Sequence, residues 1–86
     1  MNAIALQILA YLAENPDASD TAEGIADWWL PAGAARPRRA VLERALSDLT
    51  AEGWLSASRG IDATVRYRMA PHQEAAIAAL RREDGS

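Results

Sequence analysis

The chain has 86 residues, of which 50% are hydrophobic and 24% are charged, a composition typical of one small globular domain. The absence of cysteine excludes disulfide bonds and thiolate metal sites, and the single histidine, His72, offers too few ligands for zinc. We expect no cofactor, no bound metal, no membrane span and no signal peptide, and therefore a cytoplasmic protein.

The net charge of −3 is distributed unevenly along the chain. Residues 1–35 carry five carboxylates and no cation, whereas residues 36–68 carry seven arginines against four carboxylates. Lysine is absent, so every cationic side chain is a planar guanidinium that can donate two parallel hydrogen bonds. This asymmetry indicates a polyanion-facing surface on the middle segment.

A first helix is predicted over residues 3–14. Asn2 is a suitable N-cap, because its side-chain oxygen can accept a hydrogen bond from a free amide of the first turn. Asn15 ends the helix, since Pro16 disfavours helical geometry in the residue before it. The apolar residues at helical spacing on this segment are Ile4, Ile8, Leu9 and Leu12.

A second helix is predicted over residues 21–30, after a polar turn. Asp20 and Glu23 have the spacing of an acidic capping box at its start. Its apolar side includes two adjacent tryptophans, Trp28 and Trp29. Neighbouring residues cannot both face inward from one helix, so we expect one of these two side chains to be exposed.

A third helix is predicted over residues 37–52. Pro37 suits the first turn, where its missing amide proton has no consequence, and Gly53 suits the left-handed position after the last turn. The linker before this helix, which contains Gly33, is a turn by composition. The predicted apolar stripe of the helix is Val41, Leu42, Ala45, Leu46 and Leu49.

After the third helix the hydrophobic period changes from that of a helix to that of a strand. Residues 54–58 and 64–69 read as two short strands joined by a turn at residues 59–62, and Pro71 then opens a last helix over residues 72–83. In the second strand, alternation predicts one packed face and one basic, solvated face. The packed face holds Val65, Tyr67 and Met69, and the solvated face holds Thr64, Arg66 and Arg68.

Two runs in the sequence carry a resemblance to a known family. Residues 41–55, VLERALSDLTAEGWL, resemble the recognition-helix signature of MarR- and PadR-like bacterial regulators, and residues 67–71, YRMAP, are similar to the strand that closes their wing. The resemblance implies an α+β winged helix-turn-helix fold over residues 1–86: three helices, a two-stranded β-wing and a C-terminal helix. The turn between the second and third helices is longer than is usual in that motif.

The resemblance implies a small transcriptional regulator that binds duplex DNA through its third helix and its wing. At the start of that helix the candidate DNA-binding residues are Arg36, Arg38, Arg39 and Arg44. On the wing they are Arg59, Arg66 and Arg68, of which the last two are best suited to phosphates. We expect the two groups to converge on one surface. The alternative for each arginine is a solvated position paired with carboxylates such as Glu43 and Asp48.

A second hypothesis is a winged-helix module that binds a protein and not DNA, which the acidic net charge favours. Its candidate anchors are Trp28, Trp29 and Trp54, for each of which core packing is the alternative. Ile77 and Leu80 of the last helix either join two copies in a homodimer or close the domain's own core. We expect no enzymatic activity, because no nucleophile, base and acid come together in the sequence.

Overall fold

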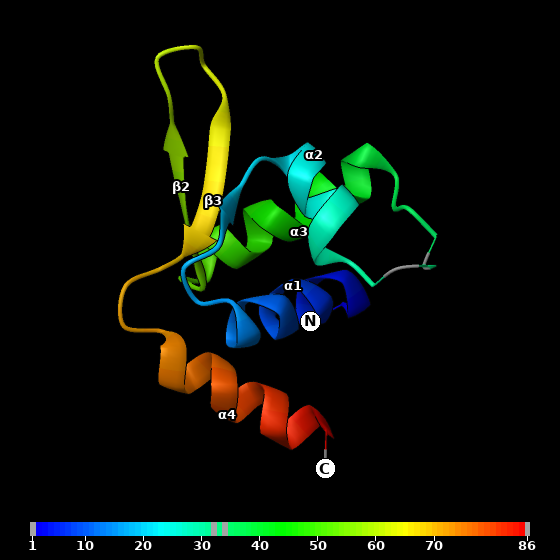
Figure 1. Cartoon of the computed structure of the whole chain (residues 1–86), viewed down its shortest axis with the longest axis vertical. Helices are drawn as coiled ribbons and strands as arrows, with labels where there is room; N and C mark the ends of the chain where they lie inside the picture. The colour runs from blue at the N-terminus through cyan, green and yellow to red at the C-terminus, as the bar shows by residue number, and fades with distance from the viewer. Residues whose placement is uncertain (1, 32, 34, 86) are drawn as a thin grey trace.

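The computed structural model describes residues 2–31, 33 and 35–85, with the side chains of the last helix described as far as residue 80. It confirms the predicted α+β order of helices, a hairpin and a final helix (Figure 1). The elements are α1 (Ala3–Glu14), β1 (Ser19–Asp20), α2 (Ala22–Gly24), the π-helical turn η1 (Ile25–Trp29), α3 (Arg39–Ala51), β2 (Leu55–Arg59), β3 (Val65–Met69) and α4 (Glu74–Gly85). We call the β2–β3 hairpin the wing.

Helix α1 spans the predicted residues and begins for the predicted reason. The side-chain oxygen of Asn2 accepts a 2.8 Å hydrogen bond from the amide of Ala5, which satisfies a donor that the helix leaves free. The helix ends at Asn15, whose amide donates to the carbonyl of Tyr11 at 2.9 Å before the chain turns at Pro16.

The second helical segment differs from the prediction. Its N-cap is Thr21, whose hydroxyl accepts a 3.2 Å hydrogen bond from the amide of Gly24, and not Asp20. Asp20 is unavailable as a cap because its backbone pairs with β3 and its carboxylate accepts from the amide of Thr21. After one α-helical turn the segment widens into η1 and ends at Trp29, so the predicted helix over residues 21–30 is two short pieces.

Helix α3 is shorter than predicted and starts two residues later. Pro37 and Arg38 lie before its first turn, with Arg38 in an extended N-cap conformation that makes no side-chain capping hydrogen bond. Val41 is 43% exposed and does not belong to the buried stripe. Its position one residue before Leu42 rotates it by about 100° from the inward face. The buried residues of α3 are Leu42, Ala45, Leu46 and Leu49.

Gly53 ends α3 in the left-handed conformation that the sequence predicted, with φ of +88°. The amide of the next residue, Trp54, donates back to the carbonyl of Leu49 at 2.9 Å. An alanine at residue 53 would meet no neighbouring atom but would carry the strain of a positive φ. We expect Gly53→Ala to lower the free energy of unfolding by about 1 kcal/mol, measured by urea denaturation. An unchanged midpoint would contradict this assignment of strain.

The sheet contains one strand more than the two predicted. Its order is β1-β3-β2, and β3 pairs antiparallel with both neighbours. Strand β1 consists of Ser19 and Asp20, opposite Arg68 and Tyr67 respectively. Two residues are too few to show a period, so the sequence indicated only a polar turn there. The wing strands themselves lie within one residue of the predicted bounds.

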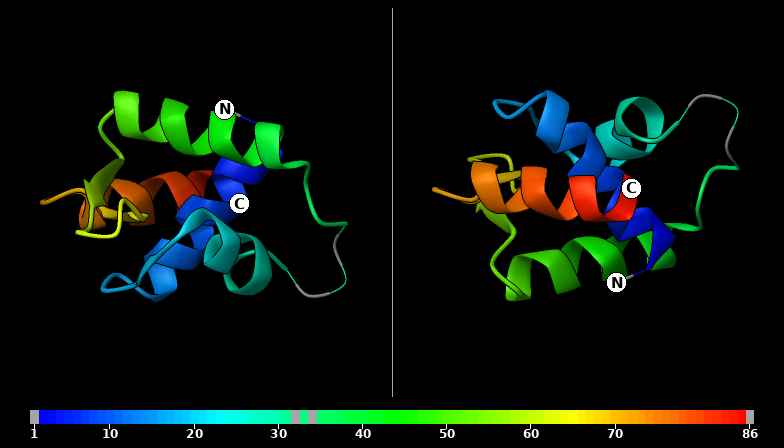
Figure 2. Two further views of the ribbon diagram at one scale, coloured as in Figure 1. Left: turned by 90° about the horizontal axis from the view of Figure 1, so that it is seen from above. Right: turned by 90° about the horizontal axis from the view of Figure 1, so that it is seen from below.

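Helix α4 starts at Glu74, two residues later than predicted. His72 adopts a left-handed φ of +66°, which is incompatible with a helical first turn after Pro71. The helix packs along α1, and in both views of Figure 2 α3 and the α2–η1 segment lie on opposite sides of the α1–α4 pair. The side-chain amide of Gln73 donates to the carbonyl of Gly53 at 3.1 Å and ties the start of α4 to the end of α3.

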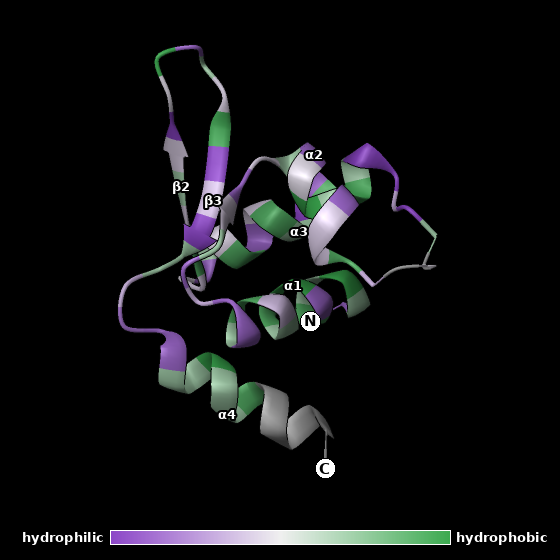
Figure 3. Ribbon diagram, in the orientation of Figure 1, coloured by the Kyte–Doolittle hydropathy of each residue, from purple (hydrophilic) through white to green (hydrophobic). Residues whose placement is uncertain are grey.

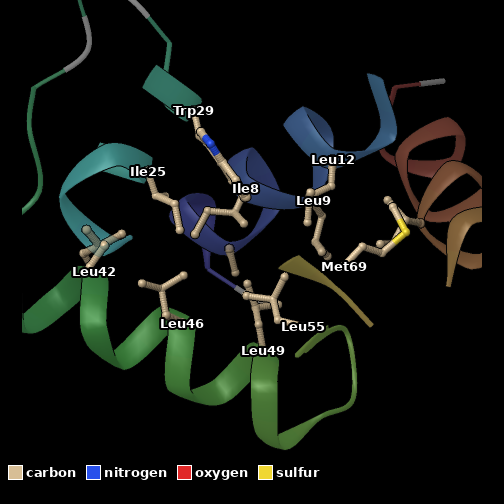
Figure 4. Close-up of a cluster of buried hydrophobic side chains, with 13 residues drawn as sticks. Ile8, Leu9, Leu12, Ile25, Trp29, Leu42, Leu46, Leu49, Leu55 and Met69 are labelled. Atoms are coloured by element: carbon tan, nitrogen blue, oxygen red, sulfur yellow. The ribbon is translucent and has the colours of Figure 1, made fainter. Parts of the chain in front are cut away.

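The hydrophobic core lies where α1, η1, α3 and the base of the wing meet (Figure 4). Tyr11 and Trp29 stack beside it, with ring centroids 4.9 Å apart.

Among the described residues, no helix is long and apolar enough to span a membrane, and no group of three potential metal ligands comes together. In the hydrophobic core, the six large side chains with the least exposure among the described residues are Ile8, Leu12, Ile25, Leu46, Leu49 and Ile77.

Candidate nucleic-acid interface

The amino-terminal end of α3 carries the four arginines that the sequence singled out, and all four are exposed. Arg36 and Arg38 lie on the extended segment before the helix, Arg39 opens it, and Arg44 lies more than one turn further on. In Figure 3 the start of α3 and bands of β3 are coloured as hydrophilic. The fold therefore presents the predicted recognition-helix residues to solvent.

Carboxylates of the chain itself pair with three of these four arginines. Arg39 forms salt bridges with Glu23 of α2 and with Glu43 one turn along α3, the latter at 2.9 Å. The hydrogen bond to Glu43 and the charge of Glu23 together raise the pKa of Arg39. The pKa of Glu23 is lowered, chiefly by a hydrogen bond from its own backbone amide, with a further contribution from Arg39.

The other two pairs join Arg36 to Asp27 of η1 and Arg44 to Asp48 of α3, the latter at 3.3 Å. In the described part of the chain Arg38 takes part in no salt bridge. The paired side chains remain between 45% and 78% exposed, and exposed pairs of this kind contribute about 0–1 kcal/mol. A phosphate can therefore displace the carboxylates, but the start of α3 is not strongly basic as folded.

The tip of the wing is a turn from Gly60 to Thr64 held by its own hydrogen bonds. The amide of Gly60 donates to the carbonyl of Thr64 at 2.8 Å, and the carboxylate of Asp62 accepts from the amide of Thr64 at 3.1 Å. These bonds from Thr64 lower the pKa of Asp62. At the base of this turn Arg59 lies opposite Val65, so the two share the face of the wing that looks towards α3.

Arg66 and Arg68 lie on the opposite face of the wing from Arg59. Their neighbours Val65 and Tyr67 line a polar hollow of about 320 Å³ together with Glu23, Arg39 and Glu43 of α2 and α3. Successive side chains of a strand point to opposite faces, so Arg66 and Arg68 point away from α3. The expectation that all the arginines converge on one surface is therefore wrong: the pleat of β3 separates them into two groups.

The five residues considered for a protein interface divide between core and surface, and one of them, Trp54, packs partly buried against the core. Trp28 is 75% exposed, while Trp29 is 5% exposed, as expected for adjacent residues of one helical segment. Ile77 is fully buried and Leu80 packs partly buried against the core. Trp29 and Ile77 are thus side chains of the chain's own core, and of the five candidates Trp28 is by far the most exposed and the best placed to meet a partner.

Sequence reasoning missed the carboxylates that pair with the arginines from other elements. Glu43 and Asp48 were detectable because each lies four residues after its arginine on one helix. Glu23 was interpreted as part of a capping box, yet its carboxylate meets Arg39 across the interface between α2 and α3. Spacing along the chain contains no signal for such contacts between elements.

The lowered pKa of Glu23 makes stability depend on pH in a defined direction. A carboxyl whose folded pKa lies below its unfolded value stabilises the fold above the unfolded value, near pH 4.5, and this stabilisation is lost as pH falls through the folded pKa. We expect Glu23→Gln to lose less stability than the unchanged protein between pH 5 and pH 3, measured as urea midpoints. Identical pH profiles would contradict a role for this carboxylate.

The chain is similar in structure to Lactococcus lactis ZitR, a MarR-family winged-helix regulator, in a point mutant of that protein. The TM-score is 0.66 at 19% sequence identity, and the match covers 99% of this chain and 55% of the ZitR chain. The chain therefore spans about half the length of the structure that it matches. No family model and no curated protein matches the sequence. The likeness establishes the winged-helix fold.

Proposed function

We propose that this chain is a DNA-binding winged-helix module of a bacterial transcriptional regulator, acting without enzymatic chemistry. The observation that carries the proposal is that two arginines, Arg38 and Arg59, are exposed on the two elements expected to meet DNA. Arg38 stands at the amino end of α3, Arg59 stands near the tip of the wing on the face towards α3, and neither makes a salt bridge in the described part of the chain.

In the proposed complex α3 enters the major groove with its amino-terminal end towards the bases, and the wing tip reaches the adjacent minor groove. Arg38 and Arg59 bind the DNA without first giving up a carboxylate partner. Arg36, Arg39 and Arg44 contribute after exchanging an exposed carboxylate partner for a phosphate, which the small energy of such pairs permits. Affinity is then modest and depends on the solution's salt concentration.

The likeness in fold to a MarR-family regulator supports assembly with a second copy, which would space two recognition helices about 34 Å apart. Ala75 and Ala76 of α4 are exposed, since Ile77 is directed into the core. These small side chains leave a flat surface on α4 for a homodimer contact. Light scattering of the purified chain measures the number of subunits directly.

The DNA-binding proposal is tested by titrating a labelled random duplex at several salt concentrations. Two unpaired arginines predict that log affinity falls with log salt at a slope of about −1.8 or steeper. Replacing Arg38 and Arg59 together by glutamine should weaken binding at least about tenfold while leaving the circular dichroism spectrum unchanged. Binding that ignores salt, or an unaffected double variant, would contradict the proposal.

A protein-binding module is the second candidate, and the exposure of Trp28 is the observation that favours it. A tryptophan that is 75% exposed beside an acidic segment is typical of an interface anchor for a protein partner. If a second copy covers it, Trp28 fluorescence becomes protected from iodide quenching as protein concentration rises, and Trp28→Phe reduces that change. Quenching that is independent of concentration excludes this self-association.

A further inference from the structure

The basic face of the sheet that points away from α3 is called here the outer face of the wing. It consists of Ser56, Ser58, Arg66 and Arg68 of the hairpin together with Ser19 of the adjoining strand β1. Arg68 lies between Ser19 and Ser56 in the sheet register, and Arg66 lies opposite Ser58. Residues directly opposite each other share a face, so the five side chains form one surface of two guanidinium groups and three hydroxyls. This face carries no carboxylate of β1, β2 or β3.

The charges near this face leave the two arginines available. Both are exposed, and in the described part of the chain neither forms a salt bridge. Asp20, the carboxylate of β1, lies opposite Tyr67 and therefore belongs to the inner face. The carboxylate of Asp62 in the wing turn accepts a hydrogen bond from the backbone amide of Thr64, and it forms no salt bridge with Arg66 in the described part of the chain.

The spacing of the two guanidinium groups fits neighbouring phosphates of a nucleic-acid strand. Arg66 and Arg68 are two residues apart on an antiparallel strand, which separates their Cα atoms by about 7 Å along β3. Each planar guanidinium can donate two parallel hydrogen bonds to one phosphate, and serine hydroxyls are common additional donors to phosphate oxygens.

The same face is poorly suited to a protein partner. Its five members include no aromatic or large aliphatic side chain, and protein interfaces depend on such anchors at their centre. Phosphate contacts need no apolar anchor, since affinity comes from charge neutralisation and counterion release. A phosphodiester backbone is therefore the ligand that fits this composition.

We infer that the outer face of the wing binds the phosphodiester backbone of a second DNA segment, separate from the segment held by α3 and the wing tip. The inference rests on the proposed function. Because strand alternation directs the two arginine groups to opposite sides of the wing, one straight duplex does not reach both. The chain accordingly holds two DNA segments, one on each side of the wing.

A two-duplex capture assay tests the inference on the full chain. A biotinylated random duplex is immobilised and saturated with protein, and capture of a second, fluorescent duplex is then measured against salt. We expect the unchanged protein to capture the second duplex. In the double variant Arg66→Gln and Arg68→Gln, the affinity for the second duplex should fall at least about tenfold. The slope of log affinity against log salt should become shallower by about 1.8, since two phosphate contacts are removed.

The matched control removes the same two charges from the other surface, as Arg38→Gln and Arg59→Gln. That control loses binding to the first duplex, whereas the outer-face variant keeps its first-duplex affinity within about twofold. The inference is overturned if the outer-face variant captures the second duplex as well as the unchanged protein does, which would happen if the α3 of a second copy bridged the two duplexes. It is also overturned if the outer-face variant loses as much binding to the first duplex as to the second. If the unchanged protein binds no duplex at all, the proposed function itself has failed.

Discussion

Leu46→Ala is expected to lower the free energy of unfolding by about 2–5 kcal/mol, which is a large part of the total stability of so small a domain. The Leu46 side chain has no exposed surface and sits in the core beside Leu42 and Leu49 (Figure 4). Truncation leaves a cavity that the surrounding core side chains fill only in part. Urea denaturation followed by circular dichroism measures the loss.

Val41→Ala is the matched control on the same helix. Sequence periodicity placed Val41 in the buried stripe with Leu46, whereas the structure leaves it 43% exposed. Its truncation should therefore change the free energy of unfolding by about 0.5 kcal/mol or less. Losses of similar size for the two variants would contradict the rotation of α3 on which the arginine positions depend.

The second large effect concerns the carboxylates around Arg39. Replacing Glu23 and Glu43 together by glutamine should tighten duplex binding by about tenfold, since it removes two charges that repel phosphate and frees the guanidinium of Arg39. A duplex titration at fixed salt gives the ratio of affinities. Few substitutions are expected to improve binding, so the direction of this effect is diagnostic.

The control for this variant removes two negative charges elsewhere, as Asp17→Asn and Glu52→Gln. Both residues are exposed, one in the turn after α1 and the other at the far end of α3. At physiological salt, screening limits their effect on a distant phosphate, so we expect a gain below about twofold. Equal gains from the two double variants would show that net charge alone, and not the pairing of Arg39, sets the affinity.

The sequence predicted those parts of the fold that depend on local signals. The cap by Asn2, the end of α1 before Pro16 and the left-handed Gly53 each follow from one residue's conformational preference. The start of the second helix was wrong because Ser19 and Asp20 pair with β3, a contact nearly fifty residues away along the chain. Tertiary pairing overrode a local capping signal there.

The sequence placed the candidate arginines on the elements where the structure has them, but it did not give their geometry. Composition and periodicity located the arginines at the start of α3 and on the wing, and all of those named are exposed. The salt bridges from Arg36 to Asp27 and from Arg39 to Glu23 join different elements, which spacing along the chain does not reveal. To see that Arg66 and Arg68 point away from α3, one must know which face of the wing packs towards α3. Only the tertiary structure gives that information.

An acidic protein that binds DNA must concentrate its cations locally. With a net charge of −3, the chain as a whole repels a polyanion, and electrostatic steering has to come from a small region. Arg38 at the start of α3 and Arg59 on the wing, which form no salt bridge in the described part of the chain, would supply such local charge at two places. This places the expected contacts at the end of the molecule that carries the wing and the start of α3, away from α4 (Figure 1).

Backbone amide chemical shifts, recorded by NMR while an unlabelled duplex is added, test this placement most directly. We expect the largest changes at the first turn of α3 and in the wing turn from Gly60 to Thr64, with little change along α1. Changes confined to the surroundings of Trp28 or to the exposed side of α4, or none at saturating duplex, would contradict it.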